Sequence, residues 1–71
     1  MVTPVSSVVT QIYEHLQRDP RTKSAVIEVS FHQGVVDLSG NVKSVKIAQA
    51  AEEIARELPG VISVTNELKV G

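Results

Sequence analysis

The stretch HQGVVDLSGNV, residues 32–42, decides the fold of this 71-residue chain. Apolar and polar residues alternate on both sides of its first glycine, which is the period-2 pattern of half-buried strands. The pattern predicts one strand over about 24–32 and a second over about 35–43. Between them, His32, Gln33 and Gly34 predict a three-residue hairpin loop, with the glycine in the left-handed conformation.

The second glycine of the stretch, Gly40, falls where the alternation would place an inward side chain, between Leu38 and Val42. A glycine there leaves room for the backbone of the following helix, or marks a bulge in the strand. A phosphate-binding loop is the functional alternative. However, GVVDLSG lacks both the G-x-G-x-x-G spacing and the lysine–serine pair of such loops. We therefore interpret Gly34 and Gly40 as structural residues.

A helix is predicted before the two strands, over about 4–18, because apolar residues recur there at helical spacing. Thr3 is suited to the N-cap position and Pro4 to the first turn. Asp19-Pro20 is predicted to end this helix, since the residue before a proline is pushed out of helical geometry.

A second helix is predicted over about 45–58, with Ser44 as its N-cap, and a last strand over about 61–70. A crossover through this helix makes the last strand parallel to the one before it. We expect one α+β domain, residues 1–71, in the order α-β-β-α-β. Both helices then pack on one face of a three-stranded mixed sheet.

Asn66 holds an inward position on the last predicted strand, between Val64 and Leu68. A buried amide needs hydrogen-bond partners. We therefore expect Asn66 to be a structural residue that holds the connection between the second helix and the last strand.

Two segments of the chain together resemble the BON domain, a small bacterial module named for osmotic-shock and nodulation proteins. They are IEVSFHQGVVDLSGNV (27–42) and AQAAEEIARELPGVISVTNELKV (48–70). The shared pattern is a loop glycine, V-x-L-S-G-x-V, a helix with A-x-x-I-A, and then G-V-x-x-V-x-N-x-L. The resemblance covers nearly the whole chain. It implies an interaction module of the bacterial cell envelope, linked to osmotic stress, that binds phospholipids or partner proteins.

Composition and motif content exclude several classes of function. A net charge of −1, a pI of about 6.0 and only two aromatic residues argue against nucleic-acid binding. Cysteine is absent, and His15 and His32 lie on different predicted elements, so we expect no metal site. No nucleophile has a histidine at useful spacing, so we expect no catalytic residues, no enzyme activity and no cofactor. No apolar run approaches the roughly 20 residues of a transmembrane helix.

Basic residues are expected to gather at one end of the predicted fold, where the first helix ends and the second begins. They are Arg18, Arg21, Lys23, Lys43, Lys46 and Lys69. Glu52, Glu53 and Glu57 are expected toward the other end. This arrangement predicts a site for anionic phospholipid head groups or for an acidic protein surface. Neither helix is basic and tryptophan-flanked, so any lipid contact is expected through head groups.

Two exposed sheet edges leave a structural function open as the alternative. In that case the domain self-associates through its edge strands, as a homo-oligomer with no lipid role. The N-terminus lacks the features of a signal peptide. The expected location is therefore the cytoplasm as the chain stands, or the periplasm or envelope if it derives from a longer exported protein.

Overall fold

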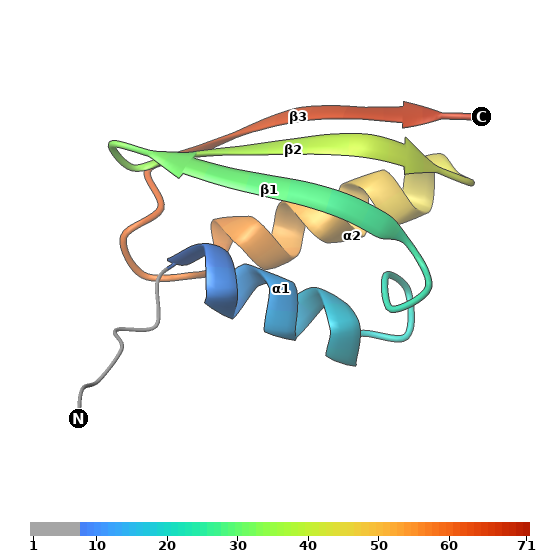
Figure 1. Cartoon of the computed structure of the whole chain (residues 1–71), viewed down its shortest axis with the longest axis horizontal. Helices are drawn as coiled ribbons and strands as arrows, with labels where there is room; N and C mark the ends of the chain where they lie inside the picture. Colours follow the sequence, from blue (N-terminus) through green and yellow to red (C-terminus); the bar gives the residue numbers. More distant parts are fainter. Residues whose placement is uncertain (1–7) are drawn as a thin grey trace.

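A computed structural model of the chain describes residues 8–71 (Figure 1). The elements are α1 Val8–Arg18, β1 Val26–His32, β2 Val35–Val42, α2 Val45–Arg56 and β3 Ser63–Val70. The predicted order α-β-β-α-β is confirmed. The predicted start of the first helix, with Thr3 and Pro4, lies outside the described residues. α1 ends immediately before Asp19-Pro20, as the proline rule predicts.

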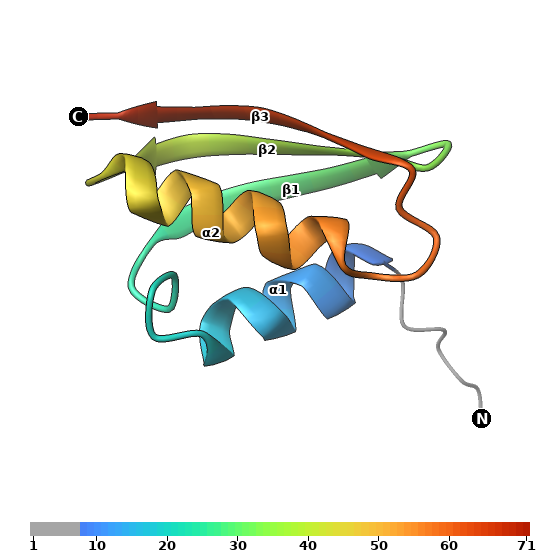
Figure 2. The same cartoon turned by 180° about the vertical axis from the view of Figure 1, so that it is seen from behind.

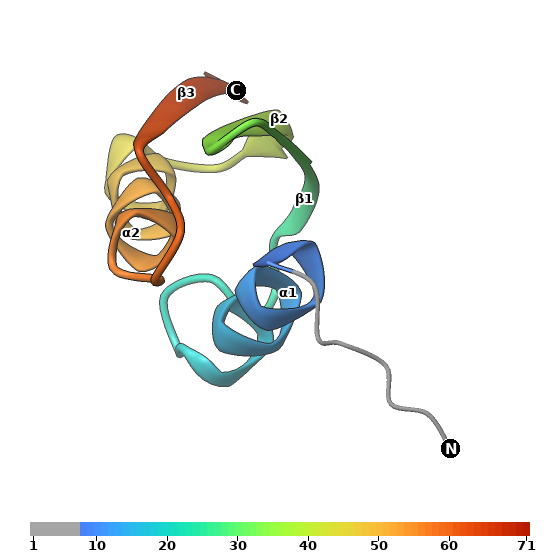
Figure 3. The same ribbon diagram turned by 90° about the vertical axis from the view of Figure 1, so that its left-hand side faces the viewer.

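The three strands form one mixed sheet in the order β1-β2-β3. β1 runs antiparallel to β2, and β2 runs parallel to β3 because α2 carries the chain back between them. Both helices lie below the sheet in Figure 1, and Figure 3 shows α2 near β3 and α1 near β1. The prediction of two helices on one face of a three-stranded sheet is confirmed, and no described helix covers the opposite face.

The hydrophobic core lies between the sheet and the two helices. Its buried members come from α1, β1, the central strand β2 and α2: Ile12, Leu16, Ile27, Val36, Leu38, Val42, Ala48, Ala51 and Ala55. The residues that α2 contributes are all alanines, so this helix can lie close to the strands (Figure 2). β2 supplies the larger side chains that fill the remaining space.

The β1–β2 hairpin is one residue tighter than predicted. His32 pairs with Val35 in the strand ladder, so the loop contains only Gln33 and Gly34. Both residues have positive φ, 51° and 87°, which a two-residue type I′ turn requires. The left-handed glycine is confirmed, but the three-residue loop is wrong because His32 remains extended.

Gly40 lies against a strand rather than a helix. Its φ is +132°, and a Cβ atom added to it would be 2.7 Å from the carbonyl oxygen of Val26 on β1. The three atoms nearest to that position all belong to β1. The interpretation that Gly40 makes room for the helix backbone is therefore wrong. The glycine allows the ends of β1 and β2 to approach each other.

Asn66 connects β3 to the middle of α2. Its half-buried amide nitrogen donates hydrogen bonds to the Ala48 carbonyl oxygen (3.1 Å) and to a carboxylate oxygen of Glu52 (3.2 Å). The expected inward, hydrogen-bonded amide is present. Its partners differ from those expected, because they lie in the body of the helix rather than in the connection to β3.

Side chains occupy one backbone amide on each edge strand of the sheet. On β1, the Val29 N–H donates to the hydroxyl oxygen of Tyr13 over 3.0 Å. On β3, the Leu68 N–H donates to the side-chain oxygen of Asn66 over 3.1 Å. These groups would otherwise be open to pairing with another strand.

Candidate functional site

Four lysines converge on one end of the domain from four different segments. They are Lys23 before β1, Lys43 between β2 and α2, Lys46 in the first turn of α2, and Lys69 at the end of β3. Figure 1 shows these segments meeting at the right-hand end. All four side chains are exposed, and within residues 8–71 no ion pair engages them. We call this cluster the lysine tip.

Ser44 creates the sharp turn that separates two of these lysines. It has an extended backbone (φ −153°), and its side-chain oxygen accepts a hydrogen bond from the Ile47 N–H over 3.3 Å. This is N-cap geometry, and it confirms the cap predicted from the sequence. Because β2 ends at Val42 and α2 begins at Val45, Lys43 and Lys46 lie on either side of the cap.

Arg21 was predicted to be part of the basic site, but its charge is already engaged. Its backbone N–H and its Nε both donate to one carboxylate oxygen of Asp19, at 2.8 and 3.0 Å, and its Nη2 donates to the other at 2.8 Å. Its Nη1 lies 3.6 Å from Glu53. The side-chain bonds from Arg21, followed by its backbone N–H, lower the pKa of Asp19 to about 2. Asp19 in turn raises the already high pKa of Arg21.

The loop after α1 explains why the charge of Arg21 is engaged by carboxylates. Thr22 is buried, and its hydroxyl donates to the Leu16 carbonyl oxygen over 2.6 Å, which folds the loop back against the end of α1. This bend of the loop brings Arg21 beside Glu53 of α2. The prediction that Glu53 lies toward the opposite end from the basic residues is therefore wrong.

Arg18 lies away from the tip. It shares a shallow pocket with Asp19, Arg21 and Glu57, between the end of α1 and α2. The structure thus divides the six predicted basic residues into two groups. Both arginines lie beside the acidic side of α2, and the four lysines form the tip. Arg21 also lines a cleft with Val26 and Lys43, so it borders the tip although its charge is paired.

Three exposed valines and a cleft complete the tip, and sequence reasoning missed them. Val26 is 81% exposed, Val45 57% and Val70 48%, at the start of β1, the start of α2 and the end of β3. A cleft of about 410 Å³ lies between the loop before β1, the end of β2 and Ile47. The sequence did contain one signal: in the alternating pattern of β1, Val26 comes directly before the inward Ile27, so its side chain points outward.

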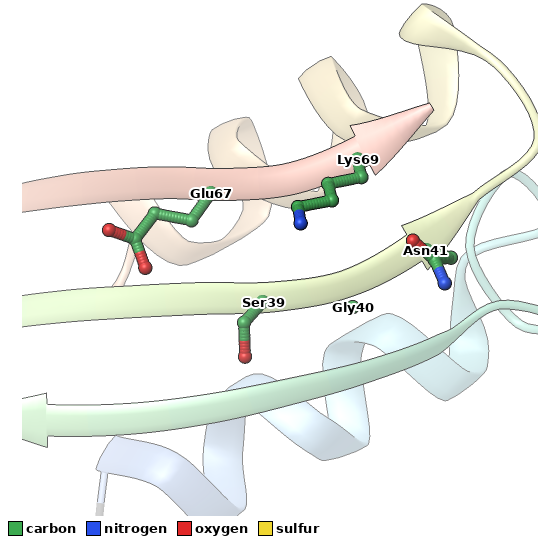
Figure 4. A pocket seen from close by; sticks show the side chains of 5 residues that line it. All are labelled: Ser39, Gly40, Asn41, Glu67 and Lys69. Carbon is green, nitrogen blue, oxygen red and sulfur yellow. The ribbon is translucent and has the colours of Figure 1, made fainter. Parts of the chain in front are cut away.

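The open face of the sheet carries a polar surface that shares Lys69 with the tip. Figure 4 shows the side chains of Ser39, Asn41, Glu67 and Lys69 around Gly40, where a shallow depression of about 560 Å³ lies. Its side chains carry charges of both signs. Across the part of the chain that is described, no group of three or more histidines and carboxylates could hold a metal ion. Nor is any described helix long and apolar enough to cross a membrane.

Fold and surface together define a small α+β domain with lysines gathered at one end. The chain matches the BON domain family over residues 5–71, and it therefore belongs to that family. BON domains are non-catalytic binding modules. A search of curated proteins finds no match.

Proposed function

We propose that this BON domain is a non-enzymatic module that docks on anionic phospholipid head groups through the lysine tip. The observation that carries the proposal is the convergence on one end of four lysines that no ion pair among the described residues engages. Docking of this kind would place the domain at a bacterial envelope membrane, in keeping with the family's association with osmotic stress.

The charge distribution matters more than the net charge of −1. Arg21 and Arg56 are paired with carboxylates on or beside α2, so their charges are locally balanced. The tip lysines are not balanced in this way. Each basic residue near an anionic membrane surface contributes about 1 kcal/mol, so four could contribute about 4 kcal/mol, or roughly a thousandfold in affinity. Salt screens such interactions over about 8–10 Å at physiological ionic strength.

Vesicle co-sedimentation tests this proposal. Binding of the parent chain is expected on vesicles that contain phosphatidylglycerol, with little binding to phosphatidylcholine alone and a steep loss with added salt. The Lys43→Gln, Lys46→Gln double variant should bind roughly thirtyfold more weakly. Arg21 is left unchanged, because its replacement would break the contacts to Asp19 and Glu53.

A matched control separates the tip from total charge. The Gln33→Glu, Ser63→Glu double variant changes the net charge by the same amount, at two exposed positions at the hairpin end of the domain. It should bind nearly as well as the parent. Equal loss in both double variants, or binding that ignores salt, would contradict the proposal.

The same experiments test two alternatives, an acidic protein partner and self-association. An acidic protein surface would meet the same lysines, and a chain that ignores anionic vesicles would favour it. Self-association through sheet edges is the structural alternative. Tyr13 and Asn66 each occupy an edge amide, which weighs against it. Sedimentation at several protein concentrations should show a monomer if the edges are protected.

A further inference from the structure

We infer that the exposed valines of the tip, Val26 and Val45 foremost, insert below the head groups when the tip docks on an anionic bilayer. This inference rests on the proposed function and deepens it, because it states how the same site engages the membrane. It distinguishes partial insertion of a loop-and-strand end from docking by charge alone.

The exposure of these valines is unusual in its placement. A single exposed aliphatic side chain is ordinary on a protein surface. Here three of the five large hydrophobic side chains that are most exposed among the described residues lie at one end, on β1, α2 and β3. Val26 is 81% exposed although the next residue, Ile27, is only 6% exposed in the core. Among residues 8–71, the three side chains keep 48–81% of their surface exposed.

The lysines stand next to the valines in a way that suits an interface between head groups and acyl chains. Lys43 and Val26 line the same cleft, which has Ile47 as an apolar wall. Lys46 is the chain neighbour of Val45 and Lys69 that of Val70, so each pair shares this end of the domain although adjacent side chains point in different directions. A lysine stem can lie along apolar surface while its ammonium group reaches outward to a phosphate. Valines beside such lysines can therefore go deeper than the charged groups.

Charge complementarity selects the bilayer as the occupant of this surface. A second copy of the chain would bring its own lysine tip against this one, and like charges would repel. An anionic bilayer offers negative head groups for the lysines and an apolar layer for the valines. Neither helix needs to lie in the membrane plane, which agrees with the polar outer faces that the sequence shows.

The chain offers a clean spectroscopic test because it contains no tryptophan. Val26→Trp and Val45→Trp each introduce a single reporter at the tip. Ile62→Trp is the matched control, since Ile62 is also 81% exposed but lies just before β3, beside the hairpin turn at the other end of the domain. Each variant is mixed with phosphatidylglycerol-containing vesicles with and without brominated acyl chains. The tip tryptophans should shift their emission to the blue and be quenched by bromine, whereas the control should not.

A second measurement avoids the bulky tryptophan reporter. The Val26→Ser, Val45→Ser double variant should lose about tenfold or more in vesicle affinity, through the lost apolar contact. Ile62→Ser should lose little. Both should keep the salt dependence of the parent, because the lysines are untouched.

The outcomes separate this inference from the proposed function. Salt-sensitive co-sedimentation without bromine quenching at either tip position would overturn insertion and leave docking by charge intact. Equal quenching at Ile62→Trp would also overturn it, since adsorption would then have no preferred end. If the parent and all variants fail to co-sediment with anionic vesicles, both the proposed function and the insertion fall.

Discussion

Replacing Gly40 with alanine should destabilise the domain far more than the addition of one methyl group suggests. The residue has φ +132°, a region that L residues rarely adopt. The new methyl group would also lie 2.7 Å from the Val26 carbonyl oxygen. That oxygen belongs to the backbone of a paired strand, so it cannot rotate away.

The expected magnitude follows from these two terms. The backbone conformation costs about 1–3 kcal/mol for a residue other than glycine. Overpacking against a fixed neighbour costs a further ~1–3 kcal/mol. Together they give about 2–6 kcal/mol, whereas a domain of this size has a total stability of roughly 4–10 kcal/mol. Gly40→Ala should therefore lose about half of the stability of the domain and unfold at a much lower urea concentration.

Gly34→Ala is the matched comparison, because Gly34 also has positive φ (87°). Its added Cβ would meet the side chain of Ile62, which is exposed and can rotate into solvent. The expected cost is about 1–2 kcal/mol. Combining it with Ile62→Ala removes this neighbour as well, so that only the cost of the positive φ remains.

Urea denaturation followed by far-ultraviolet circular dichroism measures the difference. The midpoint for Gly40→Ala should fall below that of Gly34→Ala by roughly 1 M or more, given a slope of about 1 kcal/mol per M for a small domain. Equal midpoints would mean that the ends of β1 and β2 relax apart at no cost. The role assigned to Gly40 would then be wrong.

Two further predictions concern the polar contacts. Asn66→Leu removes the bonds to Ala48, Glu52 and the Leu68 N–H, and should cost about 1–3 kcal/mol in urea denaturation while leaving vesicle binding unchanged. Weaker binding with normal stability would contradict this structural role. The Asp19 carboxylate has a pKa of about 2 in the folded chain against 3.8 without its partners. Its stabilising contribution is therefore complete above pH 3.8 and is lost as the pH falls toward 2. Asp19→Asn should flatten the pH dependence of stability in that window, and an unchanged acid profile would refute the assignment.

The fold was predictable because local signals agreed with one another. Alternation on both sides of Gly34, the helix stop at Asp19-Pro20 and the cap at Ser44 each depend on residues close in sequence. Together with the handedness of crossovers, they leave one topology. The close approach of Gly40 to Val26 on β1 was not predictable, because it depends on the positive φ of Gly40, which the alternating pattern does not report.

The candidate site was predictable only in outline. Strand directions place the lysines at one end, and that requires no side-chain detail. The pairing of Arg21 with Glu53 arises from the loop that Thr22 folds back, and no periodicity reports the course of such a loop. The inward residues of β1 and α2 were clear from the sequence. The exposure of Val26 and Val45, at the starts of these elements, depends on how the neighbouring loops pack, which the pattern does not report.

The protected sheet edges acquire a further significance if many copies gather on one membrane. Docking by a single end gives every copy the same tilt, and it confines the copies to a plane. Neighbouring sheets would then meet edge to edge at high local concentration, which is the arrangement from which continuous intermolecular sheets grow. The hydroxyl of Tyr13 on β1 and the side-chain oxygen of Asn66 on β3 each engage an amide that such growth would use. Two hydrogen bonds at the sheet edges would thus keep the domains of a crowded, aligned layer from joining into one sheet.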